Sequence, residues 1–388
     1  MNYTQQWFQR TESFRKDRLP YLPLFPSSSP YLPYSPMPSS FLLYGSYGYT
    51  GTLIAKLAVQ RGLRPTLAGR DPEKLRLQAL DLGLDHRPFS LGNPDQVTDI
   101  LRDYPLVLHC AGPFSHTSQP MAQACLRTGA HYLDITGEIT VFETLAGFDK
   151  LAQQANVMLL PGVGFDVVPT DCLALHLKNR LPTATRLALG LLSVGGAVSR
   201  GTALTGLERL NGWGAVRHQG KITPVPLGHK IRTFDFGRGS RPASAIPWGD
   251  VSTAWYSTGI PNIGVYNANF GRMGYLFRLA WMVGPLLQTK LVSGALKNYV
   301  RANFKGPTPE QNEQGKVLVS GEVKDEKGNV ARARLETPEA YYATALTALA
   351  VVEKVLAGEA KPGFQTPAKA FGADFILGVE GVKREDVA

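Results

Sequence analysis

A glycine-rich turn carries the clearest chemistry in this sequence. It reads Gly45-Ser46-Tyr47-Gly48-Tyr49-Thr50-Gly51, follows an apolar run that predicts a strand, and opens a helical pattern. In that context, backbone N–H groups and the helix dipole converge where a pyrophosphate can bind. No lysine follows the last glycine, so the turn does not resemble a P-loop. The spacing GxxGxxG is typical of reductases, and we expect all seven residues to contact a dinucleotide.

The end of the second expected strand distinguishes NAD from NADP. NAD-dependent enzymes place a carboxylate there for the ribose 2′-hydroxyl, whereas NADP-dependent enzymes offer a small residue and an arginine. This strand ends in Gly69-Arg70, and the guanidinium of Arg70 can pair with a phosphate. Asp71 precedes Pro72 and is better explained as a helix N-cap. The pattern therefore favours NADP as the cofactor.

Two further strand ends hold candidate site residues. Ala111-Gly112-Pro113 follows the fourth expected strand, where small residues would let the nicotinamide or its ribose approach the backbone; an ordinary Gly-Pro turn is the alternative. Asp134 and Glu138 flank the end of the fifth. Asp134 is the candidate catalytic residue, because a carboxylate there could orient the nicotinamide, bind substrate or donate a proton, although it could equally cap the next helix.

Other catalytic signatures are missing from the sequence. No tyrosine is followed four residues later by a lysine, which argues against a simple short-chain alcohol dehydrogenase. There is no HExxH or other metal-binding spacing, so we expect no metal. Three cysteines without paired spacing predict neither a disulfide scaffold nor a thiolate zinc site.

Short apolar runs that alternate with helical patterns predict the elements that position these residues. This alternation is the signature of βαβ units and a doubly wound, Rossmann-type parallel sheet in the α/β class. The expected strands are Phe41–Tyr44, Pro65–Ala68, Leu106–Cys110, Tyr132–Ile135 and Val157–Leu160. The expected helices are Tyr49–Arg61, Pro72–Leu82, Pro94–Arg102, Gln119–Thr128 and Val141–Ala155.

The pattern changes after Asp166 and predicts a second domain or an inserted sheet. A helix over Thr170–Arg180 leads into longer β-like runs, and Lys316–Val323 with Val330–Glu336 reads as a hairpin. Thr337 is expected to cap a last helix, with Pro338 in its first turn, that packs back on the first domain. The expected domains are residues 37–170 for NADP binding, 171–336 for the second domain and 337–388 for the returning helix and tail.

The first residues of the chain predict where the protein is located, and its net charge indicates which partners it favours. Seven prolines lie between Leu19 and Ser40, so we expect residues 1–36 to form an extended, disordered tail, or to lie upstream of a true start at Met37. The same prolines interrupt any secretory signal, which predicts a cytoplasmic protein that is not secreted. The net charge of +10 favours anionic partners. Its scattered distribution, without a nucleic-acid-binding motif, argues against nucleic acid.

Four motifs in order resemble the saccharopine dehydrogenase-like oxidoreductases, in particular the branch with trans-acting enoyl reductases. They are Gly45–Gly51, Cys110–Phe114, Tyr132–Glu138 and Gly164-Phe165-Asp166, and the likeness continues to Thr366-Pro367-Ala368. The resemblance implies an NADP-binding Rossmann domain interrupted by an α+β substrate and dimerisation domain, and hence a homodimer. It also implies that some members reduce an enoyl thioester or a related lipid intermediate.

An apolar segment, Met273–Ala295, bears on the substrate. Arg278 interrupts it, and the apolar run from Leu279 to Leu287 has only nine residues, fewer than the roughly 20 that a membrane span needs; this leaves buried core, a lid over a lipophilic substrate or a peripheral membrane contact.

The leading hypothesis is an NADPH-dependent oxidoreductase that reduces an enoyl or related double bond of a lipophilic small molecule. One alternative is a saccharopine-type amino-acid dehydrogenase, with Arg200 and Arg241 as carboxylate clamps. The other is an NADP-binding redox sensor or scaffold without turnover.

Overall fold

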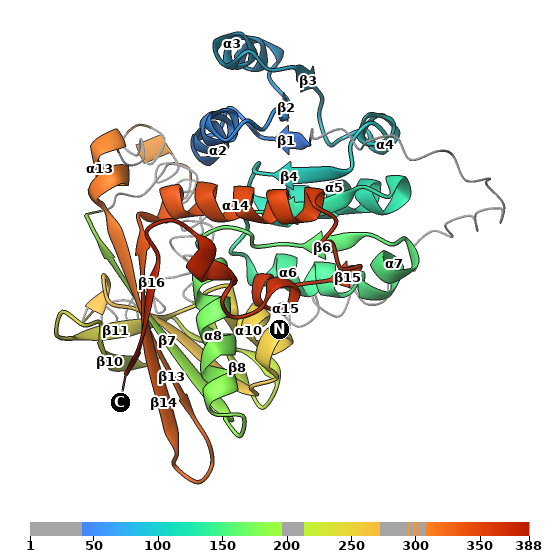
Figure 1. Cartoon of the computed structure of the whole chain (residues 1–388). Helices are drawn as coiled ribbons and strands as arrows, with labels where there is room; N and C mark the ends of the chain where they lie inside the picture. Colours follow the sequence, from blue (N-terminus) through green and yellow to red (C-terminus); the bar gives the residue numbers. More distant parts are fainter. Residues whose placement is uncertain are drawn as a thin grey trace. The chain divides into compact units, whose positions relative to one another are not determined.

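The computed structural model describes residues 41–195, 213–271 and 308–387, with a few single residues between 294 and 302. These residues belong to one compact unit (Figure 1). The expectations for residues 1–36 and for Arg200 lie outside the described residues, as does almost all of the apolar segment Met273–Ala295.

The first sheet has seven strands, all paired in parallel, in the order β15-β6-β5-β4-β1-β2-β3. Its strands are β1 (Leu42–Tyr44), β2 (Thr66–Gly69), β3 (His86–Pro88), β4 (Leu106–His109), β5 (His131–Asp134), β6 (Met158–Leu160) and β15 (Gly363–Phe364). Strand β1 lies between β2 and β4, and it pairs Leu43 with Leu67 on one side and with Leu108 on the other. This sheet confirms the Rossmann-type prediction. The sequence does not predict β3, whose residues His86-Arg87-Pro88 are exposed and form no apolar run, or β15, which has only two residues.

Helices cover both faces of this sheet. They are α2 (Tyr49–Gln60), α3 (Pro72–Leu82), α4 (Pro94–Leu101), α5 (Phe114–Thr128), α6 (Ile139–Ala146) and α7 (Asp149–Gln154). The prediction of a single helix over Val141–Ala155 is wrong, because a turn at Gly147 and Phe148 separates two helices, α6 and α7. Helix α5 also begins five residues before the expected Gln119 and carries Pro120 in its interior.

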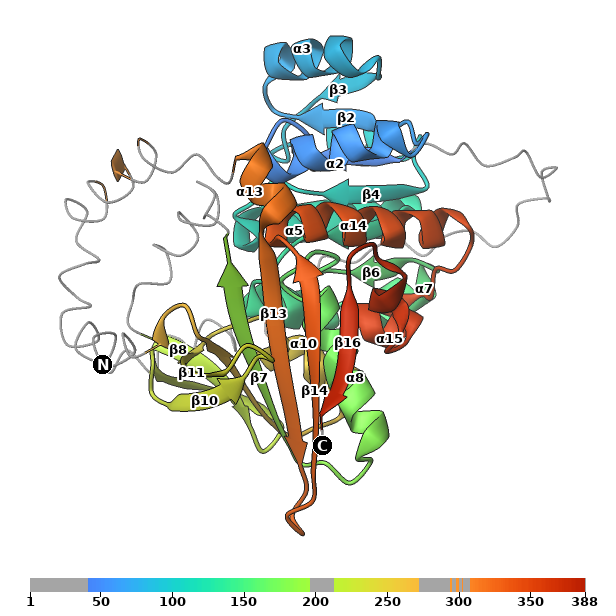
Figure 2. The ribbon, with the colours of Figure 1, turned by 60° about the vertical axis from the view of Figure 1, so that its left-hand side comes forward.

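The second sheet is mixed and has the order β10-β11-β12-β7-β13-β14-β16, with β8 and β9 branching from β12. Its strands are β7 (Arg186–Val194), β8 (Trp213–His218), β9 (Lys221–Pro226), β10 (Ile231–Asp235), β11 (Ser240–Ile246), β12 (Asn262–Asn267), β13 (Lys316–Lys324), β14 (Val330–Pro338) and β16 (Lys383–Val387). The expected hairpin is β13–β14, which pairs in continuous antiparallel register. Figure 2 shows β7, β13, β14 and β16 side by side.

Helices α8 (Val168–Arg180) and α10 (Asp250–Thr258) pack on each other beside the second sheet, and one hydrophobic cluster contains side chains from both sheets. Helix α14 (Ala340–Leu356) returns to lie along α2 (Figure 2). Two short helices, α13 (Pro309–Gln314) and α15 (Pro367–Phe371), and a 3-10 turn, η2 (Phe375–Gly378), complete the described elements. Among the helices in the described ranges, none is long and apolar enough to cross a membrane.

Helix α14 corrects one prediction. Its N-cap is Glu339, whose carboxylate accepts hydrogen bonds from the N–H groups of Tyr341 and Tyr342. The expected cap Thr337 and first-turn Pro338 instead end β14, where they pair with Val317 and Lys316. Strand pairing extends β14 to Pro338, so the helix begins two residues later than the Thr-Pro pair predicts.

Candidate cofactor and active site

The glycine turn joins β1 to α2 and leaves no room for side chains at two of its glycines. Gly45 has a φ of +83°, and a Cβ atom there would lie 2.8 to 2.9 Å from Ala111 and Cys110. At Gly51, a Cβ atom would lie 2.3 Å from the carbonyl oxygen of Gly45. Gly48 is the N-cap of α2. Because glycine has no side chain, it cannot accept a hydrogen bond from the first N–H groups of the helix, which also lack acceptors within the helix.

Ser46 is completely buried and is held by a residue that sequence reasoning missed. Its hydroxyl donates to Oε1 of Gln78 at 2.8 Å, and the amide nitrogen of Gln78 donates to the Ser46 carbonyl oxygen at 2.8 Å. Gln78 lies on α3, so this pair fixes the turn against the neighbouring βα unit. Thr50 and Tyr49 begin α2, and the Tyr49 ring lies edge-on to Tyr341 of α14 with centroids 5.0 Å apart.

The end of β2 carries the residues expected to distinguish NADP from NAD. Arg70 is exposed, and no carboxylate occupies the last position of the strand, Gly69. Asp71 accepts a hydrogen bond from the N–H of Lys74, which confirms its predicted role as the N-cap of α3. The hydroxyl of Tyr47 lies here too and accepts hydrogen bonds from the N–H groups of Arg70 and Asp71.

The loop after β4 is held by the carboxylate of Glu138, which lies in the segment after β5. Gly112 and Pro113 precede α5 and are joined by a cis peptide bond. The N–H groups of Phe114 and Ser115 donate to the two carboxylate oxygens of Glu138, each at 3.0 Å. Glu138 therefore caps α5 from a distance, which explains why the local sequence did not predict the start of this helix.

Asp134 is completely buried at the end of β5. Its carboxylate accepts hydrogen bonds from the Tyr132 hydroxyl at 2.6 Å and from the N–H groups of Thr136 and Gly162 at 2.9 and 3.0 Å. Burial raises its pKa to about 7, despite the hydrogen bonds that lower it. Through these contacts, Asp134 positions the loops after β5 and β6. Its assignment as a catalytic residue stays a prediction.

The loop after β6 carries the Gly164-Phe165-Asp166 motif and is fixed by α14. The Thr344 hydroxyl accepts a hydrogen bond from the Phe165 N–H at 3.0 Å, and a Cβ atom at Gly164 would lie 2.8 Å from Thr344. A Cβ atom at Gly137 would lie 2.4 Å from Asp166. The loops after β5 and β6 therefore touch, as do those after β1 and β4, and the four motifs meet at the carboxyl edge of the sheet.

These residues fit a bound NADP. Gly45 and Gly51 allow a tight turn that residues with a Cβ atom could not form, the amino end of α2 faces the turn, and the exposed Arg70 follows Gly69 at the end of β2. Each feature matches what a dinucleotide phosphate group requires.

A buried arginine joins the second sheet to the first domain. Arg217 of β8 is 5% exposed, and its guanidinium donates to Glu143 of α6 at 3.0 Å and to the carbonyl oxygen of Val251 at 2.8 Å. Tyr256 and Ser252 of α10 also donate to Glu143. By contrast, Arg241, which was expected as a carboxylate clamp, is exposed on β11.

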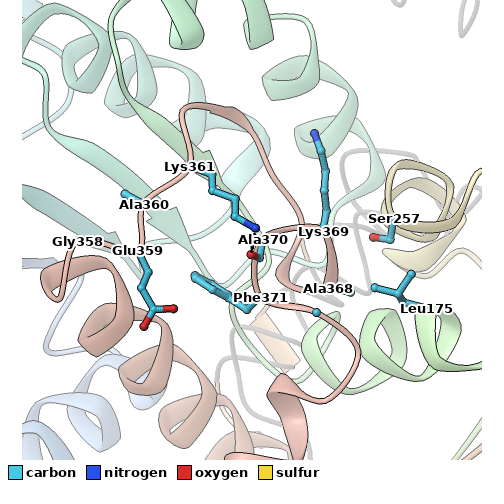
Figure 3. Close-up of a pocket in the computed structure, with 11 residues that line it drawn as sticks. Leu175, Ser257, Gly358, Glu359, Ala360, Lys361, Ala368, Lys369, Ala370 and Phe371 are labelled. Carbon is cyan, nitrogen blue, oxygen red and sulfur yellow. Dashed lines mark hydrogen bonds between the residues drawn. The ribbon is translucent and has the colours of Figure 1, made fainter. Parts of the chain in front are cut away.

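A pocket of about 810 Å³ lies elsewhere, between α8, α10, α15 and the segment after α14 (Figure 3). Lys361 and Lys369 line it, but each ammonium group donates to a backbone carbonyl oxygen, of Ala370 and Phe364 respectively. None of the expected cofactor residues lines this pocket.

Comparison with known proteins supports the assignment of the first domain. Residues 41–160 match the family model of the saccharopine dehydrogenase NADP binding domain. The match confirms both the resemblance predicted from the motifs and NADP as the cofactor of this domain.

Two kinds of curated relative are similar to the chain. The human saccharopine dehydrogenase-like oxidoreductase is 25% identical over 219 residues, which cover 49% of this chain and 51% of the human protein. The trans-acting enoyl reductase of Mycobacterium leprae is 31% identical over 147 residues, which cover 36% of this chain and 35% of that protein. The chain thus matches about half the length of the first of these relatives and about a third of the second.

The fold extends beyond the NADP-binding domain. The apo saccharopine dehydrogenase (L-Glu forming) of Saccharomyces cerevisiae superposes with a TM-score of 0.61 at 13% identity, covering 90% of this chain and all of that one. At this identity the likeness shows the shared fold alone, and it includes the second, mixed sheet.

Proposed function

We propose that the chain is an NADPH-dependent oxidoreductase that reduces an enoyl or related double bond of a lipophilic small molecule. The observation that carries the proposal is the convergence of four loops at the carboxyl edge of an NADP-binding sheet. In such sheets, ligands bind at this edge. Relatives named enoyl reductases support the reaction type.

In this proposal, different residues of this edge bind the cofactor and hold the proton. The turn at Gly45–Gly51 and Arg70 bind the cofactor's phosphates, and the loop at Gly112 lies next to them through the contact of Gly45 with Ala111. NADPH supplies a hydride to one carbon of the double bond, and a proton must reach the other. Asp134 is the proposed proton-holding group, since burial raises its pKa to about 7; because its carboxylate is completely buried and accepts bonds from Tyr132 and Thr136, this role requires that the neighbouring loops move to let a substrate reach it.

The saccharopine-type alternative needs cationic side chains that face a substrate with carboxylates. Within the described ranges, Arg217 is engaged by Glu143, and Arg241 lies exposed on β11. Neither position favours this alternative over the leading proposal.

The test is oxidation of NADPH by the purified chain with enoyl thioesters of short, medium and long acyl chains. A mixture of an amino acid and a 2-oxo acid tests the saccharopine-type alternative in parallel. We expect turnover that requires the enoyl double bond and increases with acyl length.

Other results would contradict the proposal in different ways. Turnover with the amino-acid mixture alone would support the alternative dehydrogenase. Tight NADPH binding without any turnover would support a sensor or scaffold. Homodimer formation and membrane contact stay predictions, to be checked by sedimentation and by vesicle binding.

A further inference from the structure

The end of β2 gathers groups that bind anions. The N–H groups of Arg70 and Asp71 point to one spot, where they donate to the Tyr47 hydroxyl at 3.1 and 3.3 Å. The ammonium group of Lys74 lies 5.7 Å from the centre of the Tyr47 ring. Arg70 adds an exposed guanidinium. Tyr47, a neutral residue, thus engages two donors in a cationic environment.

A phosphate is a stronger partner for these donors than a phenol. Hydrogen bonds to a charged acceptor are roughly twice as strong as those between neutral groups. The Tyr47 ring reaches its place only because residue 69 is a glycine, since a Cβ atom there would lie 2.6 Å from the ring. Gly69 therefore makes room for the ring beside these amides.

Lys74 forms an ion pair with Asp71, whose carboxylate lies close to the amides that would bind a phosphate. Its ammonium group lies 2.9 Å from the Asp71 carboxylate, and both side chains are partly exposed. The hydrogen bond from Lys74 lowers the pKa of Asp71, so this carboxylate is ionised at neutral pH. Without Lys74, the negative charge of Asp71 would repel a phosphate bound at the neighbouring amides.

We propose that the 2′-phosphate of NADPH replaces the Tyr47 hydroxyl on the amides of Arg70 and Asp71 and is stabilised by Lys74. Tyr47 and Lys74 are then specificity-determining residues that act together with Arg70. The inference deepens the proposed function, since it concerns how the same cofactor is selected.

The first test compares Lys74→Met with Arg76→Met, using fluorescence titrations with NADPH and NADH. Arg76 is a matched control, because it lies on the same helix and pairs with Glu73, as Lys74 pairs with Asp71, at a spacing of three residues. Lys74→Met should weaken NADPH about five- to tenfold and leave NADH unchanged, as expected for a partly exposed charge–phosphate contact. Arg76→Met should change neither. Equal effects of Lys74→Met on both cofactors, or no effect, would overturn the role of Lys74.

The second test is Tyr47→Phe, which keeps the ring over Gly69 and removes the competing oxygen. NADPH should bind about two- to fivefold tighter, because the phosphate no longer displaces a hydrogen-bonded hydroxyl, with NADH unchanged. Equal or weaker binding of NADPH would overturn the replacement.

Adenosine 2′,5′-bisphosphate and 5′-AMP separate this inference from the proposed function, because neither probe carries a nicotinamide. If the bisphosphate binds more tightly than 5′-AMP and depends on Lys74, the inference holds even in a chain without reductase activity. If the two probes bind alike, the subsite does not exist and the inference is wrong.

Discussion

Gly45→Ala tests how closely the glycine-rich turn is packed. The new Cβ atom would lie within 2.9 Å of backbone and side-chain atoms of Cys110 and Ala111, in a backbone conformation with φ of +83°. The left-handed conformation costs about 1–2 kcal/mol for a residue with a Cβ atom. Overpacking costs about 1–3 kcal/mol more. We expect a loss of about 2–5 kcal/mol in the free energy of unfolding, together with weaker NADPH binding as the turn moves.

Gly62→Ala separates the two costs. Gly62 also has a positive φ, of +76°, but a Cβ atom there would meet nothing within 4 Å. Only the conformational cost should appear, about 1–2 kcal/mol, with NADPH affinity unchanged. Urea unfolding of both variants and NADPH titration give the comparison. If Gly45→Ala is no more destabilising than Gly62→Ala and binds NADPH normally, the turn is not packed as described.

Three other perturbations test separate parts of the structure. Arg70→Ala should weaken NADPH roughly ten- to a hundredfold in a fluorescence titration, with NADH nearly unchanged; Arg76→Ala is the control, and equal losses for both cofactors would argue against the assignment. Because the pKa of Asp134 is raised to about 7, the folded state binds more protons than the unfolded state, so this carboxyl's contribution to stability is lost as pH rises from about 4 to about 7. Asp134→Asn should make urea-unfolding stability fall less steeply over that window, and an unchanged slope would show that the carboxyl is ionised throughout. Arg217→Met should lower the free energy of unfolding by about 1–3 kcal/mol, with NADPH affinity unchanged, because the buried guanidinium no longer donates to the carbonyl oxygens of Val251 and Gly220 or to the partly exposed Glu143; no measurable loss would show that Arg217 does not secure the second sheet.

Local signals predicted most of the first domain. Asp71 and Pro72 mark the start of α3, and Gly83 ends it in the left-handed conformation, so both ends of that helix follow from neighbouring residues. The strands β1, β2, β4, β5 and β6 were each predicted to within one or two residues, because short apolar runs between turn residues are distinctive in a parallel sheet.

The parts that were missed depend on contacts distant in the sequence. Glu138 caps α5 across more than twenty residues, and Gln78 holds Ser46 across thirty-two. Strand β15 joins the sheet beside β6 about two hundred residues after it. No local pattern carries such information. The sequence likewise placed Asp134 at the edge of the sheet but did not show that its carboxylate is buried.

The central claim is that this chain selects NADPH at the end of β2, and calorimetric titration of the unaltered chain with NADPH and NADH tests it most directly. The account predicts that NADPH binds at least tenfold tighter, as expected for charge-assisted phosphate contacts through Arg70. Equal affinities, tighter binding of NADH, or no binding of either cofactor would contradict it.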